Sequence, residues 1–181
     1  ISGSLTLLDN MMISSLSESA LSAVNLGGQF FGIQWMMIFG FNTGCSTFLT
    51  QFWGANDIKN IRKVMGFAAA NAMALSLIFF CLGMFFPRQV IGLFTADPAT
   101  QELGIQYLHT AAINFLFVAI IQPLSTALRS TQQTKIPMYI SIAAFITDVL
   151  FNYLLIFGHF GFPRLEVRGA ALATVLARVL E

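Results

Sequence analysis

Long apolar runs, most of them reaching the roughly 20 residues that a helix needs to cross a membrane, dominate the sequence. Short polar or proline-containing stretches separate them. The runs cover residues up to about 13, 21–49, 64–86, 103–128, 136–157 and from about 169 onward. We therefore expect an all-α integral membrane protein with about six transmembrane helices, the first and sixth of them truncated. Because both ends fall inside apolar runs, we expect the chain to be a piece of a longer polypeptide.

The scarcity of charge excludes other classes of protein. Only 9% of residues are charged, whereas soluble domains average about 25%. The net charge is +1, and no basic cluster with interleaved aromatic residues predicts a nucleic-acid partner. Cys45 and Cys81 lack paired spacing and a nearby histidine, so we interpret them as packing residues. No nucleophile–base pair or ligand cluster predicts an enzyme or a cofactor.

Loop charges predict the orientation in the membrane. The loop after the second run carries Lys59, Arg62 and Lys63, and the loop after the fourth carries Arg129 and Lys135. The opposite loops carry fewer basic residues. Because cytoplasmic loops are enriched in Lys and Arg, we expect both basic loops in the cytoplasm and a multi-pass protein of the cytoplasmic (inner) membrane.

The positions of proline and glycine support three further predictions about the helices. Asp97-Pro98 has the form of an N-cap followed by a proline at the first helical position. Pro123 lies inside the fourth run, where it should bend the helix or free a carbonyl group. The motifs 28-GQFFG-32 and 40-GFNTG-44 place small residues four apart, a spacing that lets membrane helices approach closely.

Two carboxylates inside the apolar runs carry most of the functional information. Asp9 lies in the first run and Asp148 in the fifth. A carboxylate at the centre of a membrane helix costs roughly 2.5–3.5 kcal/mol on insertion scales. Such residues normally face a cavity or a partner and take part in moving ions or substrates. The alternative is a carboxyl group bonded to neighbouring backbone or to a helix terminus.

Asp148 and Asn152 are four residues apart and therefore project from one face of the fifth predicted helix. Oxygen ligands suit hard cations such as Na⁺, and two carboxylates in one dry pocket suit a proton. We therefore expect Asp9, Asp148 and Asn152 to bind Na⁺ or H⁺ as the coupling ion. Four further polar residues of the second run are weaker candidates for a substrate cavity: Asn25, Gln29, Gln34 and Asn42.

Several segments, taken in order along nearly the whole chain, resemble the multidrug and toxic compound extrusion (MATE) transporters. The first is Asp9-Asn10-Met11-Met12-Ile13-Ser14, followed by Ala20-Leu21-Ser22-Ala23-Val24. The others are Gln51-Phe52-Trp53-Gly54-Ala55, Leu93-Phe94-Thr95, Asp97-Pro98, Tyr107-Leu108, Leu128-Arg129, Thr134-Lys135, Pro137-Met138, Asn152-Tyr153, Ile156-Phe157-Gly158 and 169-GAALATVLAR-178.

The resemblance implies a twelve-helix transporter of two six-helix lobes, with residues 1–181 forming the N-terminal transmembrane lobe and the C-terminal lobe missing. It implies export of small-molecule organic cations and amphipathic toxins by alternating access, in exchange for Na⁺ or H⁺. It also implies a coupling-ion site at Asp9, Asp148 and Asn152, with Thr174 contributing a hydroxyl group. The lobes would contact each other and membrane lipid.

The fifth-helix pair departs from one branch of the family, in which the order is Asn then Asp. Here Asp148 precedes Asn152, which moves the charge by one turn, about 5–6 Å along the helix. A lipid-linked oligosaccharide flippase of the same superfamily is the alternative function. Such cavities usually need several basic residues for pyrophosphate, and only Arg178 is a candidate within a predicted helix. A membrane scaffold is the other alternative, but it would have no reason to bury the two aspartates.

Overall fold

The computed structural model describes residues 18–157 and 166–181, and helices account for nearly all of these residues, with no strand among them. The predicted first helix and Asp9 lie outside the described residues. The helices are α2 (Glu18–Gly54), α3 (Ile58–Phe85), α4 (Pro87–Gly92), α5 (Pro98–Ala111), α6 (Asn114–Ser130), α7 (Lys135–Phe157) and α8 (Glu166–Leu180). The expectation of an all-α fold is therefore confirmed.

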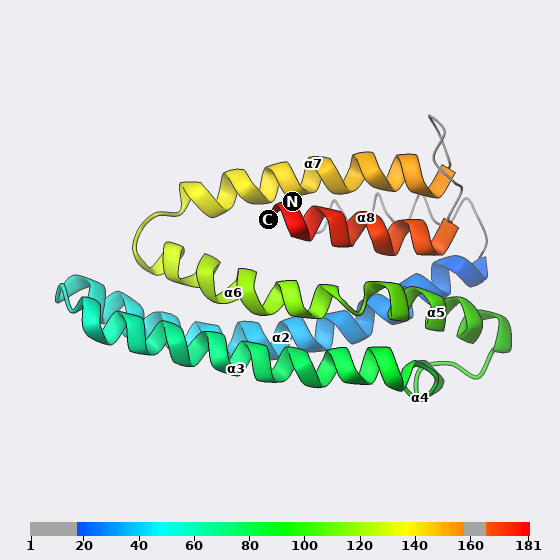
Figure 1. Cartoon of the computed structure of the whole chain (residues 1–181), viewed down its shortest axis with the longest axis horizontal. Helices are drawn as coiled ribbons and strands as arrows, with labels where there is room; N and C mark the ends of the chain where they lie inside the picture. Colours follow the sequence, from blue (N-terminus) through cyan, green and yellow to red (C-terminus); the bar gives the residue numbers. More distant parts are fainter. Residues whose placement is uncertain (1–17, 158–165) are drawn as a thin grey trace.

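The described helices form two groups (Figure 1). The long helices α2 and α3 pack side by side, and α6 packs against both of them. On the other side, α7 and α8 make the most extensive helix pair, and α5 joins the groups by contacting both α2 and α8. By contrast, α6 and α7 make few contacts although a short turn connects them. This separation leaves room for the cavity described below.

The structure contains helices that could each span a membrane. α3 and Lys135–Ile156 of α7 are each long and apolar enough to cross a membrane, and α5 with α6 forms a third, bent span. Large apolar side chains point outward along these helices, for example Phe67, Phe85 and Ile146. In water such a surface would be unfavourable, whereas lipid or a second lobe can cover it.

The bend in the third span differs from the prediction made for Pro123. The two parts meet at 51° near Ala112 and Ile113, about ten residues earlier, and α6 continues through Pro123. At the junction the amides of Phe115 and Leu116 bond the carbonyl groups three residues back, each at 3.1 Å. A tight turn of this kind redirects a helix without proline. The break therefore results from the local turn rather than from Pro123.

An aromatic cluster holds the first group of helices together next to this bend. The Phe115 ring packs edge-on against Phe30 at 5.6 Å and stacks on Phe31 at 4.5 Å, while Phe30 also contacts Phe79 at 5.0 Å. The buried Gln34 side chain donates to the Phe115 carbonyl at 3.1 Å. The cluster thus ties α2, α3 and α6 into one unit.

The glycine motifs of α2 do not mediate close helix packing within the described residues. A Cβ added at Gly28, Gly32, Gly40 or Gly44 would meet no other heavy atom within 4 Å. The expectation of close approach at these positions is therefore wrong for the helices seen here. The close backbone approach instead occurs at Gly169 of α8, where an added Cβ would lie 2.7 Å from the Leu155 carbonyl oxygen.

The helix ends agree with the sequence analysis. Asp97 caps α5, and its carboxylate accepts from the Thr100 hydroxyl at 2.6 Å and the Thr100 amide at 2.9 Å. These bonds, the hydroxyl one first, hold the pKa of Asp97 below its usual range. The turns at 55–57 and 131–134 lie at the same end of the molecule (Figure 1). This arrangement is compatible with the expectation that both basic loops face the same side of the membrane.

Candidate functional site: a cavity between α6, α7 and α8

A cavity of about 510 Å³ lies where α6 separates from α7 and α8. Its lining combines apolar side chains with a set of polar and charged ones, which is the usual composition of a small-molecule site. The lining residues are Trp35, Val118, Ile121, Gln122, Ser125, Arg129, Thr134, Pro137, Met138, Ser141, Ala144, Phe145, Asp148, Thr174, Ala177, Arg178 and Glu181.

Asp148 is the buried charge of this cavity. Its side chain is 3% exposed, and its Oδ2 accepts a hydrogen bond from Nδ2 of Asn152 at 3.3 Å. Within the described part of the chain, Oδ1 has no hydrogen-bond partner. A buried carboxylate oxygen without a donor is costly. Asp148 therefore has unused capacity to bind a proton, a cation or a donor group of a ligand.

Two residues of α8 approach Asp148 from the opposite wall. The Thr174 hydroxyl donates to the Ala170 carbonyl at 3.1 Å, and Thr174 lines the same cavity as Asp148. Arg178, one turn further along α8, lines the same cavity. The packing of α8 against α7 is thus what assembles the polar part of the site.

The structure therefore brings together three of the predicted ion-coupling residues, Asp148, Asn152 and Thr174. The fourth, Asp9, lies outside the described residues. Within the described ranges, groups of three or more His, Cys, Asp or Glu residues that could hold a metal ion do not occur. The side-chain oxygen atoms at hand for a hard cation are those of Asp148, Asn152 and Thr174.

The four polar residues of α2 do not line this cavity. Asn25 and Gln29 lie exposed on the helix surface. Gln34 is fully buried and donates to the Ser76 hydroxyl at 2.7 Å as well as to a main-chain carbonyl of α6. Asn42 is 2% exposed, and its amide atoms have no partner among the described residues. In this structure α2 contributes Trp35 to the cavity wall.

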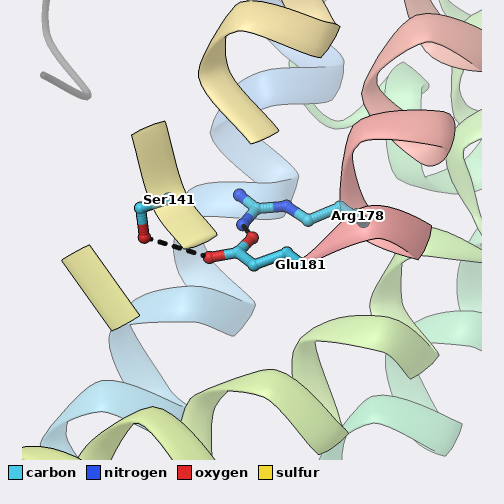
Figure 2. A network of polar contacts seen from close by, with 3 residues as sticks. All are labelled: Ser141, Arg178 and Glu181. Atoms are coloured by element: carbon cyan, nitrogen blue, oxygen red, sulfur yellow. Dashed lines mark hydrogen bonds and ion pairs between the residues drawn. The ribbon is translucent and has the colours of Figure 1, made fainter. Parts of the chain in front are cut away.

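A polar network in the cavity wall was not predicted from the sequence. Arg178 forms an ion pair with Glu181, and Ser141 of α7 donates to the second oxygen of that carboxylate at 3.5 Å (Figure 2). Arg129 also lines the cavity and is exposed. The sequence already indicates Arg178 as the one basic candidate within a predicted helix, whereas Arg129 looked like an ordinary loop charge.

The described helices form a bundle around a cavity with a buried carboxylate, an arrangement typical of one lobe of a membrane transport protein. The MatE family model matches residues 2–154, and the chain belongs to this family. Family and fold point to a multi-pass membrane transporter rather than an enzyme.

Relatives and solved structures agree with this assignment. The chain is 27% identical to the uncharacterized transporter YisQ of Bacillus subtilis over 95% of its own length and 38% of that protein. It is 27% identical to the probable multidrug resistance protein NorM of Agrobacterium fabrum, covering 93% of the chain and 36% of the relative. It is 28% identical to a FAD transporter of Shewanella oneidensis, covering 95% and 38%.

Among solved structures, the MATE multidrug transporter DinF-BH, in complex with a small molecule, superposes with a TM-score of 0.86 at 22% identity. The match covers 97% of the chain and 39% of that transporter. An inward-facing MATE transporter gives a TM-score of 0.85, with the same coverage of both chains. The chain thus spans slightly more than a third of the length of the transporters it matches, which corresponds to one lobe.

Proposed function

We propose that the chain is the N-terminal lobe of a secondary active exporter in the cytoplasmic membrane, which expels organic cations and amphipathic toxins in exchange for Na⁺ or H⁺. The observation that carries the proposal is Asp148, a carboxylate 3% exposed with a free oxygen, in the wall of a cavity of about 510 Å³. Relatives named as multidrug resistance proteins support the substrate class.

The proposed coupling uses competition for one negative charge. A cationic substrate is attracted to the ionised Asp148, and aromatic side chains such as Trp35 and Phe145 offer it stacking surfaces in the same cavity. Na⁺ or a proton that enters from outside neutralises Asp148, together with Asp9, and weakens this hold. Alternating access then requires only that the two lobes favour different conformations when the ion or the substrate is bound.

The experiment measures efflux of a fluorescent organic cation from cells that express the full-length protein, with either a Na⁺ or a H⁺ gradient imposed. Asp148→Asn and Asp9→Asn are compared with the wild type at matched expression. We expect both variants to insert normally and to lose gradient-driven efflux, because each removes one ionisable group. The gradient that drives the wild type identifies the coupling ion.

Asp97→Asn is the matched control for this experiment. It makes the same chemical change at an exposed helix cap, where asparagine caps a helix about as well as aspartate. Efflux by this variant should equal that of the wild type. Unimpaired efflux by Asp148→Asn would refute the coupling role of Asp148. Absence of efflux from the wild type under both gradients would favour the lipid-linked oligosaccharide flippase instead.

A further inference from the structure

Opposite charges occupy the two ends of the cavity. Asp148 is buried at one end, and the exposed Arg129 lies at the other, near Pro137. From Pro137 to Asp148 the wall formed by α7 is eleven residues long, which is about 16 Å at the helical rise of 1.5 Å per residue. The cavity is therefore long enough for a molecule that presents a different charge to each end.

Among the described residues, no acidic side chain pairs with Arg129, the positive charge at the exposed end of the cavity. Arg178 is paired with Glu181, which Ser141 also contacts. No ion pair or side-chain hydrogen bond holds the Arg129 guanidinium in the part of the chain that the structure describes. Of the two arginines in the cavity wall, Arg129 is thus the one available to a ligand.

Arg129 continues a polar stripe along one face of α6. Gln122, Ser125 and Arg129 of α6 are spaced by three and four residues, so they share one helix face, and all three line the cavity. Thr134 adds a hydroxyl group beside them. Amide, hydroxyl and guanidinium groups together form a donor-rich wall, which suits an oxyanion.

We propose that Arg129 binds an acidic group of the transported molecule, so that the cavity recognises compounds that carry a carboxylate as well as an organic cation. The inference rests on the proposed export function and narrows its substrate class. Arg129 then acts as a specificity residue. It selects for the acidic group, while Asp148 at the buried end selects for the cation. A planar guanidinium offers a carboxylate two parallel hydrogen bonds, which lysine cannot reproduce.

The test compares two dyes that differ only at the acidic group. Rhodamine 6G is an ethyl ester with a single positive charge, and its free acid is a zwitterion at neutral pH. Binding of each dye to the purified full-length protein is measured by fluorescence anisotropy. Arg129→Gln should weaken binding of the free acid about tenfold, which corresponds to about 1.4 kcal/mol, and should leave the ester within about twofold. Arg129→Lys should fall between the wild type and Arg129→Gln for the acid.

Lys135→Gln is the matched control, because it removes a positive charge from the same end of the protein at a residue that does not line the cavity. It should leave both dyes unaffected. Retained binding of the ester by Arg129→Gln shows that the variant is folded. An equal loss for ester and acid, or no loss for the acid, would overturn the role of Arg129 while the export proposal stands. Failure of the wild type to bind either dye would refute both proposals.

Discussion

Replacement of Gly169 by alanine should separate the two helices that build the candidate site. An added Cβ would lie 2.7 Å from the carbonyl oxygen and 2.8 Å from the carbonyl carbon of Leu155, whereas ordinary contacts begin at 3.4 Å. The helices must therefore move apart by about 0.7 Å, since backbone atoms cannot rotate away. Overpacking of this kind costs up to about 3 kcal/mol, and the higher helix propensity of alanine returns about 1 kcal/mol.

The expected net loss is about 2 kcal/mol, which lowers the melting temperature of a unit of about 150–250 residues by about 4–8 °C. The assay is thermal unfolding of the detergent-solubilised protein, followed by size-exclusion fluorescence. Gly40→Ala is the control, because an alanine there meets nothing within 4 Å and should melt at the same or a slightly higher temperature. If Gly169→Ala melted like Gly40→Ala, the close approach of α7 and α8 would be refuted.

Two further perturbations test the packing of α2 and the cap of α5. Gln34→Leu leaves the buried Ser76 hydroxyl and a carbonyl of α6 without their donor, so we expect a loss of about 1–3 kcal/mol in thermal unfolding, whereas Gln29→Leu at the helix surface should change little. Because hydrogen bonds from Thr100 lower the pKa of Asp97, its contribution to stability is complete above about pH 4 and disappears as the pH falls through the lowered pKa. Asp97→Ala should abolish this acid-dependent part of the melting curve, and a melting curve that kept it would contradict the assignment.

Local sequence patterns predicted the helical membrane character, the cap at Asp97 and the shared face of Asp148 and Asn152. Each of these follows from residues fewer than about 25 positions apart, through hydropathy, capping chemistry or the helical repeat. The position of the bend was not predictable in this way. Proline is a local signal, but the break at Ala112 arises from a turn beside the buried contact between α2 and α6.

The glycines of α2 show the same limit of prediction from local sequence patterns. Their spacing permits close packing, yet whether a partner helix approaches depends on the remainder of the fold, and within the described residues none does. Gly169 has a similar spacing, with the small residue Ala173 four positions on, and it is the position at which α8 meets the backbone of α7. The sequence shows which residues allow contact but not which of them the fold uses.

The amino-acid sequence by itself determined that this chain is a bundle of membrane helices with a rare carboxylate at Asp148, because hydropathy and burial cost act on each segment independently. Only the tertiary structure decided that Thr174 and Arg178 line the same cavity as that carboxylate and that Arg129 lies at the other end of this cavity. These residues come from three helices, and their distances depend on how the helices pack. The site is therefore a property of that packing rather than of any single segment.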